Sequence, residues 1–170
     1  MSIVLHGVAA GKGIAIGHAH LITRGAAEVP QYDIDPDKLD AEVARFDNAI
    51  KATRKELEQL RGAIPENAPT ELGAFISLHL MLLTDVTLSR EPIDILREQK
   101  INAEWALKQQ SDKLAAQFDS IDDDYLRERK QDMLQVVRRI HNNLVGQSNE
   151  INLAGNLFDD TVLIAHDLSP

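Results

Sequence analysis

A stripe of apolar side chains between residues 39 and 60 constrains the fold of this chain more than any other feature. Its members recur at alternating spacings of four and three: Leu39, Val43, Phe46, Ile50, Thr53, Leu57 and Leu60. This spacing places them along one narrow face of an α-helix, which must be buried against other helices. Asp35-Pro36-Asp37 predicts the start of the helix, because Asp favours the N-cap and Pro the first turn. Gly62 predicts its end.

The same kind of pattern predicts three further long helices. They cover approximately residues 67–83, 102–118 and 122–146. The pair Thr84-Asp85 interrupts the first of these, and a short helix can follow at about 88–99, with Pro92 early enough to be tolerated. Four main helices joined by short connections predict an up-down bundle over residues 35–146.

The two ends of the chain differ from its centre. Residues 13–22 and 161–165 are rich in β-branched side chains and lie beside turn residues, which predicts strands. Residues 1–30 and 147–170 are therefore expected to supply strands to one sheet, with the helical region inserted between them. The expected fold class is α+β, mostly α. Because the chain stops directly after a strand, we expect the strand-containing part to be incomplete.

Charge and composition limit the classes of partner. The chain has 18 basic and 27 acidic side chains, a formal net charge of −9, and no cysteine. The acidic balance disfavours nucleic-acid binding and fits a partner with positive charge. Disulfides and cysteine chemistry are excluded. No apolar run approaches the roughly 20 residues of a membrane span, so we expect a cytoplasmic protein that does not bind membranes.

Three apparent ligand motifs do not have the spacing that their chemistry requires. Gly7 is separated by three residues from Gly11-Lys12, whereas a phosphate-binding P-loop requires four. The acidic run at 119–124 lacks the turn glycine of a calcium loop and is expected to start a helix instead. His18 and His20 share one face of a strand, but no third metal ligand is evident. We therefore expect no metal site.

His79 lies at the centre of the apolar stripe of the 67–83 helix and is open to two interpretations. A histidine in this position is most often a satisfied core residue. The alternative is an interface position among exposed leucine and methionine side chains. Leu78, Leu80 and Met81 widen the apolar face, so this helix is expected to touch more than one surface. Catalysis by His79 lacks support, because no nucleophile or carboxylate lies at a suitable helical spacing.

Four stretches carry a pattern that goes beyond spacing. They are residues 7–19, residues 79–85, the segment Tyr-Leu-Arg-Glu-Arg at 125–129, and residues 162–170. Their combination, in this order, resembles Enzyme I, the phosphoenolpyruvate–protein phosphotransferase of the bacterial phosphotransferase system. The resemblance covers nearly the whole chain and corresponds to the N-terminal segment of that family.

The resemblance implies which part of the family's activity this segment carries. In the family, a helical subdomain docks the phosphocarrier protein HPr and is inserted into an α/β subdomain of phosphohistidine type. A histidine of the α/β part takes a phosphoryl group from phosphoenolpyruvate and hands it to HPr for sugar uptake, and a separate C-terminal barrel binds phosphoenolpyruvate and Mg²⁺. The sequence ends before the family's Gly-Gly-x-x-Ser-His loop. We therefore expect no catalytic residue or cofactor in this segment, which should be inactive alone, and the phosphoryl-accepting histidine beyond Pro170.

For docking, the resemblance points to residues around the second and fourth main helices. Those at positions like the HPr-facing set are Glu71, His79, Leu82, Leu88, Leu126 and Arg129. With the resemblance, the interface interpretation of His79 becomes the favoured one, because that face is expected to be exposed. Leucines would supply apolar burial, while charged groups would mostly raise the association rate and fix orientation. Glu71 and Arg129 remain open to a second interpretation as ordinary surface charges.

Two alternatives to a docking segment of Enzyme I stay open. One is a non-enzymatic helical module for regulation or assembly, which would associate into an oligomer through exposed strand edges. The other is the nitrogen-branch paralogue of Enzyme I, whose carrier differs only subtly. For the leading interpretation, the expected partners are HPr and the C-terminal barrel of the full-length chain.

Overall fold

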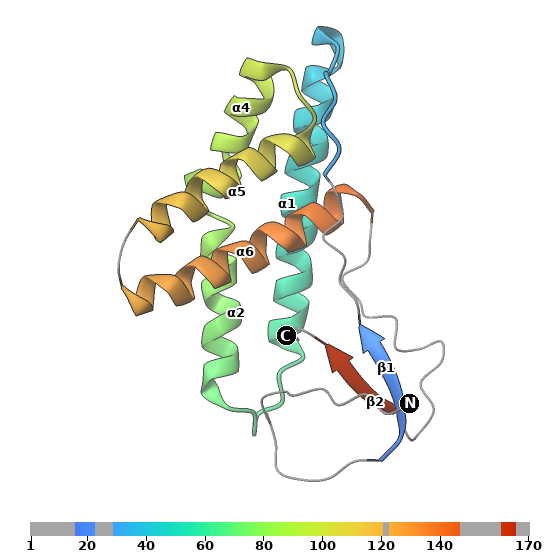
Figure 1. The fold of residues 1–170 in the computed structure, drawn as a ribbon, viewed down its shortest axis with the longest axis vertical. Coiled ribbons are helices and arrows are strands. Elements are labelled where there is room, and N and C mark those ends of the chain that lie inside the picture. Colours follow the sequence, from blue (N-terminus) through green and yellow to red (C-terminus); the bar gives the residue numbers. More distant parts are fainter. Residues whose placement is uncertain (1–15, 23–28, 121–122, 147–160, 166–170) are drawn as a thin grey trace, which may run out of the picture. The chain divides into compact units, whose positions relative to one another are not determined.

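The computed structural model describes residues 16–22, 29–120, 123–146 and 161–165 (Figure 1). The chain divides into two compact units, one of Met1–Ala26 with Asn152–Pro170 and one of Ala27–Ile151. The described residues are mostly helical, and their helices belong to the second unit, which we call the helical unit.

The elements of the helical unit follow the order expected from the apolar spacing. They are the 3-10 helix η1 (Pro36–Lys38) and the α-helices α1 (Leu39–Gly62), α2 (Thr70–Leu82), α3 (Val86–Ser89), α4 (Glu91–Gln99), α5 (Ala103–Asp119) and α6 (Asp124–Leu144). The long helices predicted from the sequence are thereby confirmed. The short helix predicted at 88–99 is instead two helices, because Arg90 leaves the helical conformation between α3 and α4, with φ −120°.

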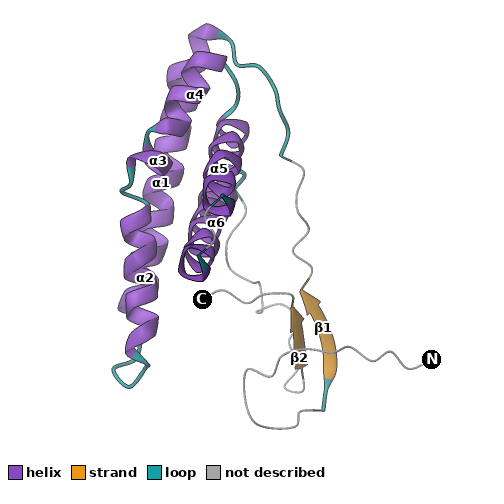
Figure 2. Cartoon of the chain, turned by 60° about the vertical axis from the view of Figure 1, so that its left-hand side comes forward, coloured by secondary structure: helices purple, strands orange, loops and turns teal. Residues whose placement is uncertain are grey.

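The helices of this unit form two layers. Along α1, the first layer contains α2, α3 and α4 in succession, and α5 and α6 lie side by side in the second layer (Figure 2). Figure 1 shows α5 and α6 running across α1 and α2 rather than along them. The layers are therefore crossed, and this crossing distinguishes the helical unit from an up-down bundle with near-parallel axes.

The core lies between the two layers and contains most of the predicted stripe of α1. Phe46 and Leu57 are each 1% exposed, and Thr53 is fully buried with its hydroxyl donating to the carbonyl oxygen of Ala49. Leu60 is the exception among the stripe residues, because its position in the last turn of α1 leaves it 39% exposed. Among the described side chains of α6, those that are buried are Met133, Val136, Ile140 and Leu144. On both α1 and α6, the buried residues thus recur at spacings of three and four.

The described part of the other unit is a pair of parallel strands. These are β1 (His18–Ile22) and β2 (Thr161–Ala165), in a register that pairs His18 with Thr161 and Ile22 with Ala165. Parallel strands require a crossover connection, which the intervening chain supplies. The strand predicted at 161–165 is confirmed, whereas residues 13–15 of the other predicted strand lie outside the described residues.

Among the described residues, no single helix is both long and apolar enough to cross a membrane. Taken together, α2 and the α3–α4 stretch have the length and apolar composition of a membrane span, but the two parts are bent by 61° relative to each other. Much of its apolar character is explained by the core, where Ile76, Leu88 and Leu96 are buried.

Candidate functional site

The turn between α2 and α3, which we call the α2–α3 corner (residues 81–88), is fixed by short-range hydrogen bonds. At the end of α2, the Thr84 hydroxyl donates to the carbonyl oxygen of Met81 at 2.7 Å. At the start of α3, one carboxylate oxygen of Asp85 accepts from the Thr87 backbone N–H at 2.8 Å and from the Thr87 hydroxyl at 2.7 Å. Asp85 is therefore the N-cap of α3, which satisfies a backbone donor that the helix leaves without a partner.

This corner exposes large apolar side chains. Met81 is 60% exposed and Val86 is 61% exposed, and Leu82 between them in sequence is half-buried. Exposed apolar side chains at a turn with hydrogen-bonded backbone geometry are a feature found at protein interaction sites. The sequence indicated Leu82 but not Met81 or Val86 as site residues. The available signal was the apolar coverage of α2 beyond its stripe, which placed Met81 outside the core face.

Two residues predicted for docking are buried instead. Leu88 is 1% exposed and lies in the core, and His79 is fully buried. The exposure expected for His79 is thus absent, because its position on the α2 stripe faces the interior of the helical unit. The ring of His79 lies 4.1 Å from the ring of Phe75, and neither ring nitrogen has a hydrogen-bond partner within the described residues.

Burial also controls the ionisation of His79. Removal from water lowers the pKa of the imidazole to about 4, with a raising contribution from Asp132 and a lowering one from Arg139. Asp132 and Arg139 both belong to α6, so the imidazole lies within electrostatic range of that helix. At neutral pH His79 is therefore uncharged.

Glu71 and Arg129 lie at different places on the helical unit. Glu71 is exposed in the first turn of α2. It stands ten residues before Met81, and that separation corresponds to about 15 Å along the helix. Glu71 is therefore not brought to the α2–α3 corner. On α6, a guanidinium nitrogen of Arg129 lies 3.1 Å from a carboxylate oxygen of Asp132, the residue that influences His79. Leu126 lies in α6, and its side chain is outside the described residues.

The expectation of no metal site can be compared with the structure only for the residues that it describes. Within residues 16–22, 29–120, 123–146 and 161–165, no group of three or more His, Asp or Glu side chains could hold a metal ion. The α2–α3 corner combines exposed apolar side chains with a hydrogen-bonded backbone turn.

Comparison with known protein families gives a match over most of the chain. The family model described as PEP-utilising enzyme, N-terminal, matches residues 6–129. The phosphoenolpyruvate-protein phosphotransferase of Cupriavidus necator is 43% identical over 177 aligned residues, covering 100% of this chain and 30% of the relative. That of Bacillus subtilis is 33% identical, covering 98% of this chain and 28% of the relative. The chain therefore spans about 30% of the length of the curated relatives it matches.

Two solved structures that are similar to this chain are also described as Enzyme I proteins. A solution NMR structure of an Enzyme I protein matches with a TM-score of 0.78 and 32% identity, covering 96% of this chain and 65% of that chain. A structure described as the N-terminal domain of Enzyme 1 - Nitrogen matches with a TM-score of 0.68 and 24% identity, covering 92% of this chain and 71% of the other. The second match concerns the fold alone.

Proposed function

This chain belongs to the family of PEP-utilising enzyme N-terminal domains, and from that premise we propose that it is the carrier-docking part of a phosphoenolpyruvate–protein phosphotransferase, Enzyme I. In the intact enzyme, a phosphoryl group passes from phosphoenolpyruvate through a histidine to HPr for sugar uptake. We assign the docking of HPr to the helical unit. The accepting histidine, the C-terminal barrel and its sites for phosphoenolpyruvate and Mg²⁺ belong to the rest of the full-length protein, which we place in the cytoplasm.

The observation that supports this assignment best is the α2–α3 corner. Met81 and Val86 present apolar surface to solvent on a backbone that is fixed by the Asp85 cap. A partner that covers them gains from apolar burial at about 25 cal/mol per Å² of surface removed from water. The formal charge of −9 favours a partner with a basic surface, because complementary charge raises the association rate and orients the encounter.

The remaining proposed residues fit around this corner in different roles. Leu82 is half-buried and supplies further apolar surface, while Leu88 and His79 support the corner from within. Arg129, together with Leu126, contributes from α6, where its pairing with Asp132 keeps the guanidinium oriented. Glu71, at the far end of α2, acts through long-range attraction rather than contact.

In this proposal the helical unit is inserted into an α/β subdomain of phosphohistidine type. The support is that β1 and β2, at the two ends of the chain, pair with each other in parallel, while the residues between them include the helical unit. The histidines described here do not take part in phosphoryl transfer. Instead, the transfer is in-line and is supported by charges positioned in the intact enzyme.

A titration of the ¹⁵N-labelled chain with unphosphorylated HPr tests the docking assignment. We expect backbone amide shifts centred on residues 81–88 and on the first turns of α6. Met81→Lys should weaken binding at least tenfold, because it places a charge in the apolar contact. Leu60→Lys is the matched control, since Leu60 is also exposed but lies at the other end of the α1–α2 hairpin. Absence of amide shifts at the α2–α3 corner would overturn the assignment.

The same titration separates the alternatives. Tighter binding of the nitrogen-branch carrier than of HPr would identify the paralogue. A chain that binds neither carrier but forms a defined oligomer by light scattering would favour the non-enzymatic assembly module, which uses strand edges.

A further inference from the structure

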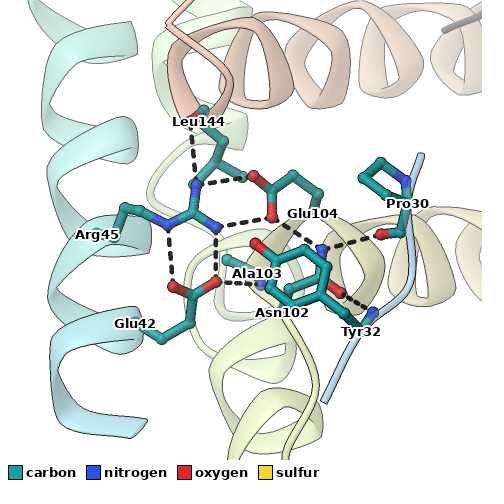
Figure 3. A network of polar contacts seen from close by, with 8 residues as sticks. All are labelled: Pro30, Tyr32, Glu42, Arg45, Asn102, Ala103, Glu104 and Leu144. Atoms are coloured by element: carbon teal, nitrogen blue, oxygen red, sulfur yellow. Dashed lines mark hydrogen bonds and ion pairs between the residues drawn. The ribbon is translucent and has the colours of Figure 1, made fainter. Parts of the chain in front are cut away.

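Arg45 of α1 uses every donor of its guanidinium group in a partly buried polar network (Figure 3). Its Nε donates to Glu42 Oε2 at 3.0 Å, and its Nη2 donates to Glu42 Oε1 at 2.6 Å and to Glu104 Oε2 at 2.7 Å. Its Nη1 donates to Glu104 Oε1 at 2.7 Å and to the backbone carbonyl oxygen of Leu144 at 3.0 Å. These five hydrogen bonds satisfy the five N–H groups that an arginine carries.

The two carboxylates carry this network to the start of α5. Glu42 Oε1 also accepts the backbone N–H of Ala103 at 2.8 Å, so a side chain of α1 caps the N-terminus of α5. Glu104 Oε2 accepts from the side-chain amide of Asn102 at 3.0 Å. Asn102 is fully buried and Glu104 is 6% exposed, so the network is held in the interior of the helical unit.

Asn102 connects the network to the segment that leads into the helical unit. Its side-chain amide donates to the carbonyl oxygen of Pro30 at 3.0 Å, and its side-chain oxygen accepts the backbone N–H of Tyr32 at 3.1 Å. The backbone N–H of Asn102 donates to the carbonyl oxygen of Tyr32, also at 3.1 Å. The side chain and the backbone N–H of Asn102 therefore both hold the incoming segment at residues 30–34, and the Ile34 N–H adds a backbone bond to the carbonyl oxygen of Lys100 at 2.7 Å.

The other end of the network holds the place where the chain leaves the helical unit. Leu144 is the last residue of α6, and the carbonyl groups in the last turn of a helix generally need hydrogen-bond donors from outside the helix ladder. Arg45 satisfies this carbonyl group directly. The guanidinium group thus bonds directly to the outgoing end of α6, and it is linked to the incoming segment through Glu104 and Asn102.

The charges in this network depend on one another. Burial alone would raise the pKa of Glu104, but hydrogen bonds from Arg45 and Asn102 hold that pKa below its ordinary value. The hydrogen bonds from Arg45 to Glu104 and then to Glu42 raise the pKa of the guanidinium. Removing Arg45 would leave the buried carboxylate of Glu104 without its cation. A partly formed network is therefore much less stable than the complete one.

We propose that Arg45 is a clamp that couples the two connections of the helical unit, so that the incoming segment at residues 30–34 and the outgoing end of α6 at Leu144 are held or released together. The bonds to backbone at both connections distinguish this role from an ordinary ion pair between helices. In this proposal, one hydrogen-bond network holds both the incoming and the outgoing connection of the helical unit.

Amide hydrogen exchange on the full chain tests the coupling. The reporter for the incoming segment is the Tyr32 N–H, and the reporter for the outgoing end is the Val145 N–H, which donates to the carbonyl oxygen of His141 at 3.0 Å. Arg45→Lys keeps the positive charge but lacks the planar set of five donors. We expect it to accelerate exchange about tenfold at both reporters, since both open together when the clamp is released.

A substitution at the incoming connection should also affect amide exchange at the outgoing connection. Asn102→Ala removes only the contacts to the incoming segment and to Glu104, and it should accelerate exchange at Val145 as well as at Tyr32. Arg97→Lys is the matched control, because Arg97 pairs with Asp40 on the surface. It should leave both reporters unchanged.

Two outcomes would overturn the proposal. Acceleration at one reporter without the other would show that the two connections open independently. Equal acceleration at the buried Leu107 amide of α5 would show that Arg45 acts only through global stability. Trp105 fluorescence, from the same helix, checks that each variant is folded before exchange is measured.

Discussion

The imidazole of His79 packs against the phenyl ring of Phe75, with ring centroids 4.1 Å apart and planes tilted by 51°. The two rings lie on successive turns of α2; His79 is fully buried, whereas Met81, two residues later, is 60% exposed. A buried, titratable ring therefore lies two residues before the α2–α3 corner, whose side chains at Met81 and Val86 are exposed.

The stability of the helical unit should fall as the pH is lowered from about 6.5 to about 4. The pKa of His79 is lowered from 6.5 to about 4 in the folded state, so the folded protein resists protonation more than the unfolded one does. The contribution of the neutral His79 to the free energy of unfolding is fully present above pH 6.5. It decreases toward pH 4, by up to about 3 kcal/mol. Urea denaturation at pH 7.0, 5.5 and 4.5 measures this slope. His79→Leu should flatten it, and an unchanged slope in that variant would contradict the prediction.

Leu88→Ala should destabilise the fold rather than weaken docking directly. Because Leu88 is 1% exposed, the substitution leaves a cavity and is expected to lower the free energy of unfolding by about 2–5 kcal/mol. Val86→Ala, at a position 61% exposed, is the control and should change stability by less than about 0.5 kcal/mol. Thermal melts followed by circular dichroism distinguish the two, and equal melting temperatures would place Leu88 outside the core.

Asp85→Ala should loosen the α2–α3 corner. The substitution removes the acceptor for the Thr87 backbone N–H, a loss that typically lowers helix stability by about 0.5–2 kcal/mol. The effect should appear as faster amide exchange within α3 and as weaker binding of HPr. Asp47→Ala, at an exposed position within α1, serves as the comparison and should leave both quantities unchanged.

Arg45→Met should lower the free energy of unfolding by about 2–3 kcal/mol, because Glu104 would remain buried without its cation. The figure is smaller than for a fully buried pair, since the Arg45 side chain is 34% exposed. Arg97→Met removes a surface ion pair with Asp40 and should change stability by less than about 1 kcal/mol. Chemical denaturation of the three proteins at pH 7 compares them, and equal midpoints would refute the difference.

Local periodicity explains how much of the helical unit could be predicted. The burial of Phe46 and Leu57 follows from their spacing on one helix, and the cap at Asp85 follows from residue preferences close in sequence. The crossing of the two layers does not follow from spacing, because it depends on how side chains of separate helices interlock.

The candidate site shows the same limit. Spacing identified the stripe that contains His79 but could not say whether it faces the core or a partner, and the structure places it in the core. Glu42 and Arg45 are at a helical spacing that a sequence can indicate. The contact of Arg45 with Glu104, 59 residues later, is a tertiary relationship that no local pattern contains.

The parallel pairing of His18 with Thr161 has a consequence for the order of folding. The two strands are separated by on the order of 140 residues, so closing the sheet carries a large loop entropy, whereas the helices make contacts among nearer neighbours. During synthesis on the ribosome, β1 must wait until β2 has emerged, while α1 to α6 have already been made. The helical unit is thus expected to fold before β1 and β2 pair with each other.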